Sequence, residues 1–253
     1  MVRRHCHLWG AMVVGLAFFP LAGCSKEPPP VKTAPPVVNQ EPSLGEAEAA
    51  AVKVLEESGA KVNMHRNQQG KPVAVYSVAF PEKVKVTHAA LKALKETNVE
   101  RLSLGAIPNR SDVTDAELAE LKQIKKLEYL MLDGTAITDA GLKEIGELTN
   151  LLWLELSRTA VTDVGVKELK NLKKLELLGL GATKITDAGL KELKELTKLE
   201  QLFLGDTQVT DAGLKELLGL TRLRNIILVR TRVTDKGVRE LERALPVLER
   251  VQR

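Results

Sequence analysis

Cysteine and histidine are nearly absent from this 253-residue chain, which has two cysteines and four histidines. Only His65 and His88 lie beyond residue 24, and their spacing does not match that of a zinc site. The chain also lacks Gly-x-Ser-x-Gly, a phosphate-binding glycine loop and His-Glu-x-x-His. We therefore predict a protein that is not an enzyme, with no catalytic residue, metal or cofactor.

The chain also lacks a large excess of charge of either sign. The net charge is +4, and it falls to +2 once Arg3 and Arg4 are set aside. Runs such as Lys191-Glu192-Leu193-Lys194-Glu195 alternate in sign, which is typical of a solvated helix face. A nucleic-acid-binding surface would instead carry a basic stripe. We therefore predict that nucleic acid is not a partner.

No apolar run is long enough to span a bilayer. The apolar stretch from Leu8 to Leu21 has fourteen residues, whereas about 20 are needed. Two arginines precede it and Leu21-Ala22-Gly23-Cys24 ends it, which is the arrangement of a secretory signal. The last four residues resemble the bacterial lipobox, although an ordinary signal peptide with an incidental cysteine is the alternative.

The lipobox resemblance implies that residues 1–23 are a signal peptide and that Cys24 is the lipid attachment site. Several acyl chains on one residue anchor a protein stably. We accordingly expect a protein of the cell envelope, lipid-anchored to the outer membrane or to the periplasmic side of the inner membrane. Because Cys6 leaves with the signal, the mature chain has no free thiol and no disulfide.

Residues 24–43 are rich in proline and contain little that could form a core. This composition favours extended polyproline conformations, so the segment predicts a tether that reaches up to about 60 Å. A ligand for an SH3-type domain is the alternative. The prolines are Pro28, Pro29, Pro30, Pro35, Pro36 and Pro42.

A cap is predicted over residues 44–72. Ser43-Leu44-Gly45-Glu46 matches a capping box, and Gly59 stands where a helix C-cap glycine belongs. Alternating apolar residues from Ala60 to Met64 predict a strand, and residues 67–71 predict a turn. A helix and an added strand would cover the open end of a repeat array.

The rest of the chain repeats every 24 residues. Thr-Asp recurs at 114–115, 138–139, 162–163, 186–187, 210–211 and 234–235. In one unit, Leu175-x-x-Leu178-x-Leu180 predicts a strand with one buried face. Ile185, Leu190, Leu193 and Leu196 then have the spacing of an amphipathic helix. Either Thr186 or Asp187 can be its N-cap.

This pattern resembles the leucine-rich repeat family, in its cysteine-containing or ribonuclease-inhibitor-like type. The resemblance implies an α/β solenoid, a right-handed horseshoe segment with a parallel sheet on the concave face and helices on the convex face. It covers residues 73–253 in about seven units, with weaker units at Val75 and Val99. In the second of these, Ile107 takes the ladder place and Pro108–Asp112 forms a loop.

Threonine takes the position where the family has Asn or Cys, which closes an internal hydrogen-bond ladder. We expect these threonines to be structural, because a hydroxyl can satisfy backbone groups freed at a strand end. They are Thr135, Thr159, Thr183, Thr207 and Thr231. The alternative is plain β-propensity.

Aromatic residues are rare, at 3% of the chain, so their positions are informative. Tyr129, Trp153 and Phe203 occupy outward strand positions, where packing gives no reason for an aromatic. Exposed aromatics that cluster are typical binding anchors. The predicted contact residues of the concave face are Tyr129, Met131, Trp153, Glu155, Leu177, Phe203 and Ile227, with Arg158, Asp206 and Arg230 as a polar rim. The alternatives are that a long side chain or the linker covers these residues, or that single exposed apolar groups have no functional meaning.

The sequence therefore predicts a membrane-anchored, monomeric module that binds another protein through its concave face. A glycan is the alternative ligand. A passive spacer of the cell envelope is the alternative function, and a role as a substrate receptor rests on analogy of fold alone.

Overall fold

The structure is a computed structural model that describes residues 43–81, 83–105, 110 and 112–253. The predicted signal peptide, Cys24 and nearly all of the tether lie outside the described residues. Ile107 and most of the loop predicted at 108–112 also lie outside them.

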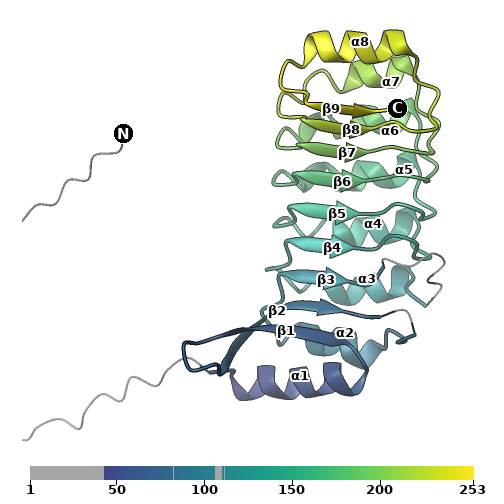
Figure 1. Ribbon diagram of the computed structural model, residues 1–253. Coiled ribbons are helices and arrows are strands. Elements are labelled where there is room, and N and C mark those ends of the chain that lie inside the picture. Colours follow the sequence, from purple (N-terminus) through teal and green to yellow (C-terminus); the bar gives the residue numbers. More distant parts are fainter. Residues whose placement is uncertain (1–42, 82, 106–109, 111) are drawn as a thin grey trace, which may run out of the picture. The chain divides into compact units, whose positions relative to one another are not determined.

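The described strands form one sheet of nine in chain order (Figure 1). β1 pairs antiparallel with β2, and every later pair is parallel, in register at successive repeats. The strands are β1 Lys61–Arg66, β2 Pro72–Ala79, β3 Arg101–Ser103, β4 Tyr129–Met131, β5 Trp153–Glu155, β6 Leu177–Gly179, β7 Gln201–Phe203, β8 Asn225–Ile227 and β9 Arg250–Gln252.

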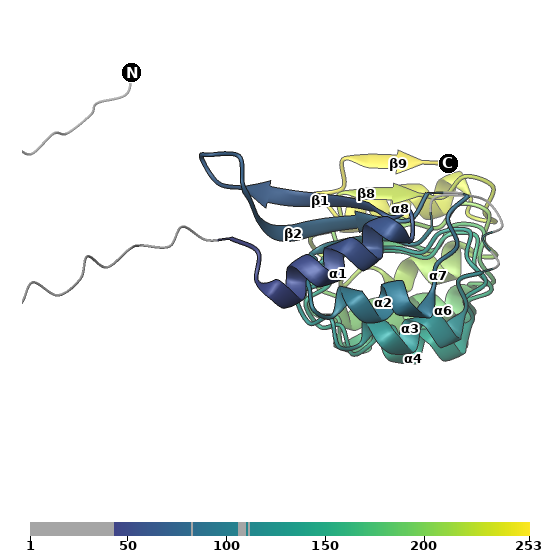
Figure 2. The same ribbon diagram turned by 90° about the horizontal axis from the view of Figure 1, so that it is seen from below.

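Helices cover one face of this sheet, as Figures 1 and 2 show. They are α1 Glu46–Glu57, α2 His88–Leu94, α3 Asp115–Leu121, α4 Asp139–Ile145, α5 Asp163–Val166, α6 Asp187–Glu192, α7 Asp211–Glu216 and α8 Asp235–Ala244. Two short 3₁₀ helices, η1 Lys167–Asn171 and η2 Leu193–Glu195, extend α5 and α6. Each strand from β2 to β8 is therefore followed by a helix that returns the chain to the next strand.

One apolar core runs between the strands and the helices. Leu178 of β6 is fully buried, as are Leu175 and Leu180 beside it and Leu190 and Leu193 of the helical segment. The same positions are buried in the neighbouring repeats, so a single cluster extends from Val52 to Leu245. No repeat could bury this surface alone, and stacking buries it. The predicted strand and helix faces are confirmed.

The two residues of the Thr-Asp repeat have different roles. Thr186 is the N-cap of α6, and its hydroxyl accepts a hydrogen bond from Ala188 N–H. Asp163, at the start of the preceding helix, accepts from Thr186 N–H at 2.8 Å and from the Thr186 hydroxyl at 2.6 Å. Threonine thus caps its own helix, while aspartate binds the next repeat. The sequence left the N-cap open between Thr186 and Asp187, and the structure shows that it is Thr186.

This inter-repeat Asp–Thr contact occurs five times. Each carboxylate accepts one backbone and one hydroxyl hydrogen bond from the threonine 23 residues later. The pairs are Asp115–Thr138, Asp139–Thr162, Asp163–Thr186, Asp187–Thr210 and Asp211–Thr234. A 24-residue period keeps every one of these contacts in register.

The ladder threonines bond within their own repeats. Each hydroxyl donates to the leucine carbonyl three residues earlier, at 2.5 to 2.7 Å. Each hydroxyl thus satisfies a backbone carbonyl just after a strand, as expected of a residue with a structural role. Unlike these threonines, the helix-start aspartates form side-chain hydrogen bonds to the next repeat.

The helix and strand expected before the repeats are present, but the capping box is not. The N-cap of α1 is Gly45, with no side-chain hydrogen bond. Because α1 begins at Glu46, Ser43 lies two residues ahead of the N-cap position, too early to cap it. Gly59 follows the helix at φ +87°, in the left-handed region expected of a C-cap glycine.

Candidate functional site

The sheet face that turns away from the helices is called the strand face below. The first residue of each short strand forms one column across it and the third residue forms another. The first column runs Ser77, Arg101, Tyr129, Trp153, Leu177, Gln201, Asn225 and Arg250, and the second runs Ala79, Ser103, Met131, Glu155, Gly179, Phe203, Ile227 and Gln252.

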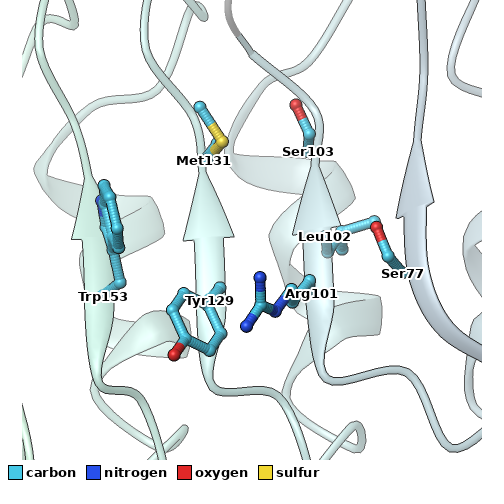
Figure 3. Close-up of a pocket in the computed structure, with 7 residues that line it drawn as sticks. All are labelled: Ser77, Arg101, Leu102, Ser103, Tyr129, Met131 and Trp153. Carbon is cyan, nitrogen blue, oxygen red and sulfur yellow. The ribbon is translucent and has the colours of Figure 1, made fainter.

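Aromatic and cationic groups stack along the first column. The Tyr129 and Trp153 rings lie on adjacent strands, with centroids 6.0 Å apart and planes tilted by 48°. The Arg101 guanidinium lies over the other side of Tyr129, 4.2 Å from the ring centroid. Figure 3 shows Tyr129 between these two side chains, with Met131 farther along β4. The prediction that Tyr129, Met131 and Trp153 are neighbours is confirmed.

A pocket of about 280 Å³ opens over these strands (Figure 3). It is called the strand-face pocket, and its lining is Ser77, Arg101, Leu102, Ser103, Tyr129, Met131 and Trp153. Trp153 is 39% exposed and Met131 is 37% exposed, so both present apolar surface to solvent. No carboxylate is among these lining residues.

Sequence reasoning placed Arg101 in the correct column but did not select it as a contact residue. Its register with Tyr129 on the next strand was the available signal. An arginine beside an aromatic in one column predicts stacking of the guanidinium on the ring.

Glu155 is less available than predicted. A Cβ on Gly179 would lie 2.0 Å from Glu155 Oε1, so the carboxylate occupies the space that the glycine leaves. Glu155 also accepts from Ser157 N–H at 3.0 Å. Burial raises the pKa of Glu155 and the Asp133 charge adds to this, while Ser157 and Arg158 only partly oppose the rise. The side chain is held against the sheet.

Leu177 corrects the predicted set of contact residues, because it is only 3% exposed. It lies between Trp153 and Gln201 in its column. Phe203 and Ile227 are half-buried on adjacent strands. In the second column, Glu155 and Gly179 separate them from Met131. The predicted contact residues therefore form two groups.

The predicted rim residues are engaged with acidic partners. Arg158 pairs with Asp133, and Arg230 makes two hydrogen bonds to Asp206, at 2.5 and 2.6 Å. The hydrogen bond from Arg230 holds the pKa of Asp206 below its usual value. These charges compensate each other on the strand face.

Two further findings concern the described part of the chain only. Over residues 43–81, 83–105, 110 and 112–253, no three metal-ligating side chains gather as they would around an ion. Over the same residues, no helix combines the length and apolarity needed to cross a membrane.

No protein-family model matches the chain, and no curated protein is similar to it in sequence. Solved structures are similar in fold. The internalin inlF of Listeria monocytogenes has a TM-score of 0.55 and 22% identity, over 70% of this chain and 47% of the internalin. The internalin C2 (inlC2) of the same organism has a TM-score of 0.51 and 20% identity, over 82% of this chain and 92% of the other.

The present chain thus spans about half of the inlF structure. Identities of this size establish a shared fold only. Together with the repeated strands, helices and leucine core, they show that the chain folds as a leucine-rich repeat solenoid like those of the two internalins.

Proposed function

We propose that this protein is a lipid-anchored, non-catalytic module that binds a protein partner on its strand face. The observation that carries the proposal is the cluster of half-buried Tyr129 with exposed Met131 and Trp153 around the strand-face pocket. Soluble proteins rarely gather large apolar side chains on a surface without a binding role. Tryptophan and tyrosine are also the residues most enriched among interface anchors.

The rest of the strand face offers fewer exposed apolar side chains, which supports the strand-face pocket as the place of contact. Beyond Trp153, the first column continues with buried Leu177 and then with polar Gln201 and Asn225. Charged side chains near the strand ends are paired, as Asp133 is with Arg158. The strand-face pocket therefore combines apolar anchors with a surrounding polar surface, as interfaces do.

Site-specific photo-crosslinking of the full chain in its native envelope tests the contact. A photoreactive residue at Met131 is expected to capture a discrete protein, whereas one at Val164 is not. Val164 is a matched control because it is 64% exposed but belongs to α5, away from the strand face. Equal capture of the same protein from both positions, or no capture from Met131, would contradict the proposal.

The membrane attachment rests on the lipobox-like Leu21-Ala22-Gly23-Cys24 and has its own test. Wild type is expected in the membrane fraction and labelled by a radioactive fatty acid. A Cys24→Ser chain is expected to lose the label. A Cys24→Ser chain that still took up label would show that another residue carries the lipid.

A further inference from the structure

We infer that the strand-face pocket binds an acidic side chain that stands next to an apolar one in a peptide segment of the partner. This inference rests on the proposed function, because it specifies the chemistry of the same contact. It depends on how Arg101 is held, on what surrounds it and on the size of the pocket.

Arg101 offers a cation that the described residues do not neutralise. It is exposed, it lies in the pocket lining, and its guanidinium contacts the Tyr129 ring at 4.2 Å. Within the described ranges, no carboxylate forms an ion pair with it. Arg158 and Arg230, just past the ends of β5 and β8, differ in this respect, since each has an acidic partner.

The stacking also orients the guanidinium. A guanidinium that stacks on a ring through its flat face leaves the N–H groups at its edges free to donate. A carboxylate that approaches the edge can accept two parallel hydrogen bonds, which is the strongest geometry for this pair. Ser77 and Ser103, on β2 and β3, add two hydroxyl groups to the pocket lining.

The other part of the pocket is apolar. Met131 and Trp153 line it from β4 and β5. Two acids near the carboxyl ends of β4 and β5 are already held, Glu155 over Gly179 and Asp133 beside Arg158. A ligand carboxylate therefore meets an attractive charge at one end and an apolar surface at the other.

Pocket size and ring geometry favour a peptide over a glycan. A volume of about 280 Å³ is just below the range of about 300–1,000 Å³ that holds whole small molecules. It suits one or two side chains. The rings of Tyr129 and Trp153 are tilted by 48°, so they do not form one flat platform against which a sugar could stack.

A displayed library of random 12-residue peptides, selected on the purified full chain, tests the inference. Selected peptides are expected to carry Asp or Glu beside an aromatic or large aliphatic residue. A synthetic peptide with that acid changed to its amide is expected to bind about tenfold more weakly. The full chain is also applied to a glycan array that contains anionic sugars.

Three variants locate the contact, after melting curves show that each is folded. Arg101→Gln is expected to weaken binding of acidic peptides about tenfold, and Trp153→Ala to weaken it as well. Arg250→Gln is the matched control, because Arg250 is exposed in the same column at the far end of the sheet. It is expected to change nothing.

The outcomes separate the inference from the proposed function. Peptides that depend on Trp153 but bind equally well to Arg101→Gln would overturn the inference and leave the proposed function standing. Peptides that are all insensitive to Trp153→Ala would overturn both. Binding to an anionic glycan without any selected acidic peptide would also overturn the inference.

Discussion

From α4 to α8, the glycine two positions after the helix-start aspartate is required by the preceding repeat. At Gly189, a Cβ would lie 2.4 Å from Asp163 Oδ1, the oxygen that accepts from Thr186 N–H. The same clash, at 2.2 to 2.4 Å, occurs at Gly141, Gly165, Gly213 and Gly237. Glycine is a poor helix former, so its use here indicates that room for the carboxylate outweighs helix propensity.

Gly189→Ala is therefore expected to lower the free energy of unfolding by about 2 kcal/mol, although alanine is the better helix former. Urea denaturation measures the change. Gly219→Ala is the matched control, because no atom lies within 4 Å of its added Cβ, and it is expected to be nearly neutral. When Gly189→Ala is added to a chain that already carries Asp163→Ala, it is expected to lower the free energy of unfolding much less, because the clashing oxygen is gone. Fully additive losses would contradict this account.

Glu155 predicts a pH dependence of stability. Burial raises its pKa in the folded chain above the ordinary value of 4.5. As pH rises above 4.5, the unfolded chain loses this proton first, so folding becomes less favourable until the folded-state pKa is passed. Glu155→Gln removes the effect and keeps an acceptor for Ser157 N–H. Urea denaturation at pH of about 4 and about 7 is expected to show that the free energy of unfolding of the variant, relative to that of wild type, is greater at the higher pH. An identical difference at both values would contradict the shift.

Residue chemistry explains which predictions stayed open and which were wrong. Thr186 and Asp187 both carry acceptors suited to a helix start, so the sequence could not separate the cap from the contact to the next repeat. Leu177 has the outward parity of an exposed residue, yet it is buried in the structure, and its strand position alone could not show this. The Glu155 side chain lies against the sheet because its register partner Gly179 has no side chain. Predicting this would have required the register of the two strands.

At the scale of elements, α1 closes the end of the array through one buried carboxylate. Glu48 is 8% exposed, and its Oε1 accepts from Val75 N–H at 3.0 Å and from Asn98 N–H at 3.3 Å. These amides belong to β2 and to the segment before β3. The helix therefore supplies the acceptor that a preceding repeat would otherwise provide. The repeat pattern predicted the need for a cap, but not this residue.

Glu48→Ala is expected to lower the free energy of unfolding by about 3 kcal/mol, because two amides are left without an acceptor. Glu48→Gln keeps Oε1 and is the matched control, with a smaller loss expected. Urea denaturation measures stability, and hydrogen exchange at Val75 N–H reports on the site itself. Unchanged exchange at Val75 in the alanine variant would show that the carboxylate does not hold this strand.

At the scale of the whole molecule, each described repeat contacts mainly its neighbours. The side-chain contacts between repeats join residues about 23 positions apart, and each strand pairs with the next in sequence. Such periodic coupling made the fold predictable from sequence, because one unit, once interpreted, applies to the rest. The contact surface was predicted less well, because it depends on side chains that do not repeat.

The row of strands has a mechanical consequence. The cap helix α1 lies at one end of the row and β9 at the other (Figure 1). Tension between these ends pulls along the direction of the hydrogen bonds that join successive strands. We expect repeats to peel off one at a time, each lengthening the chain by roughly 80 Å. Single-molecule stretching would show a series of equal steps, and one large rupture would contradict it. A partner bound near β3 to β5 and pulled by thermal motion would thus be held by an elastic connection that lengthens before it breaks.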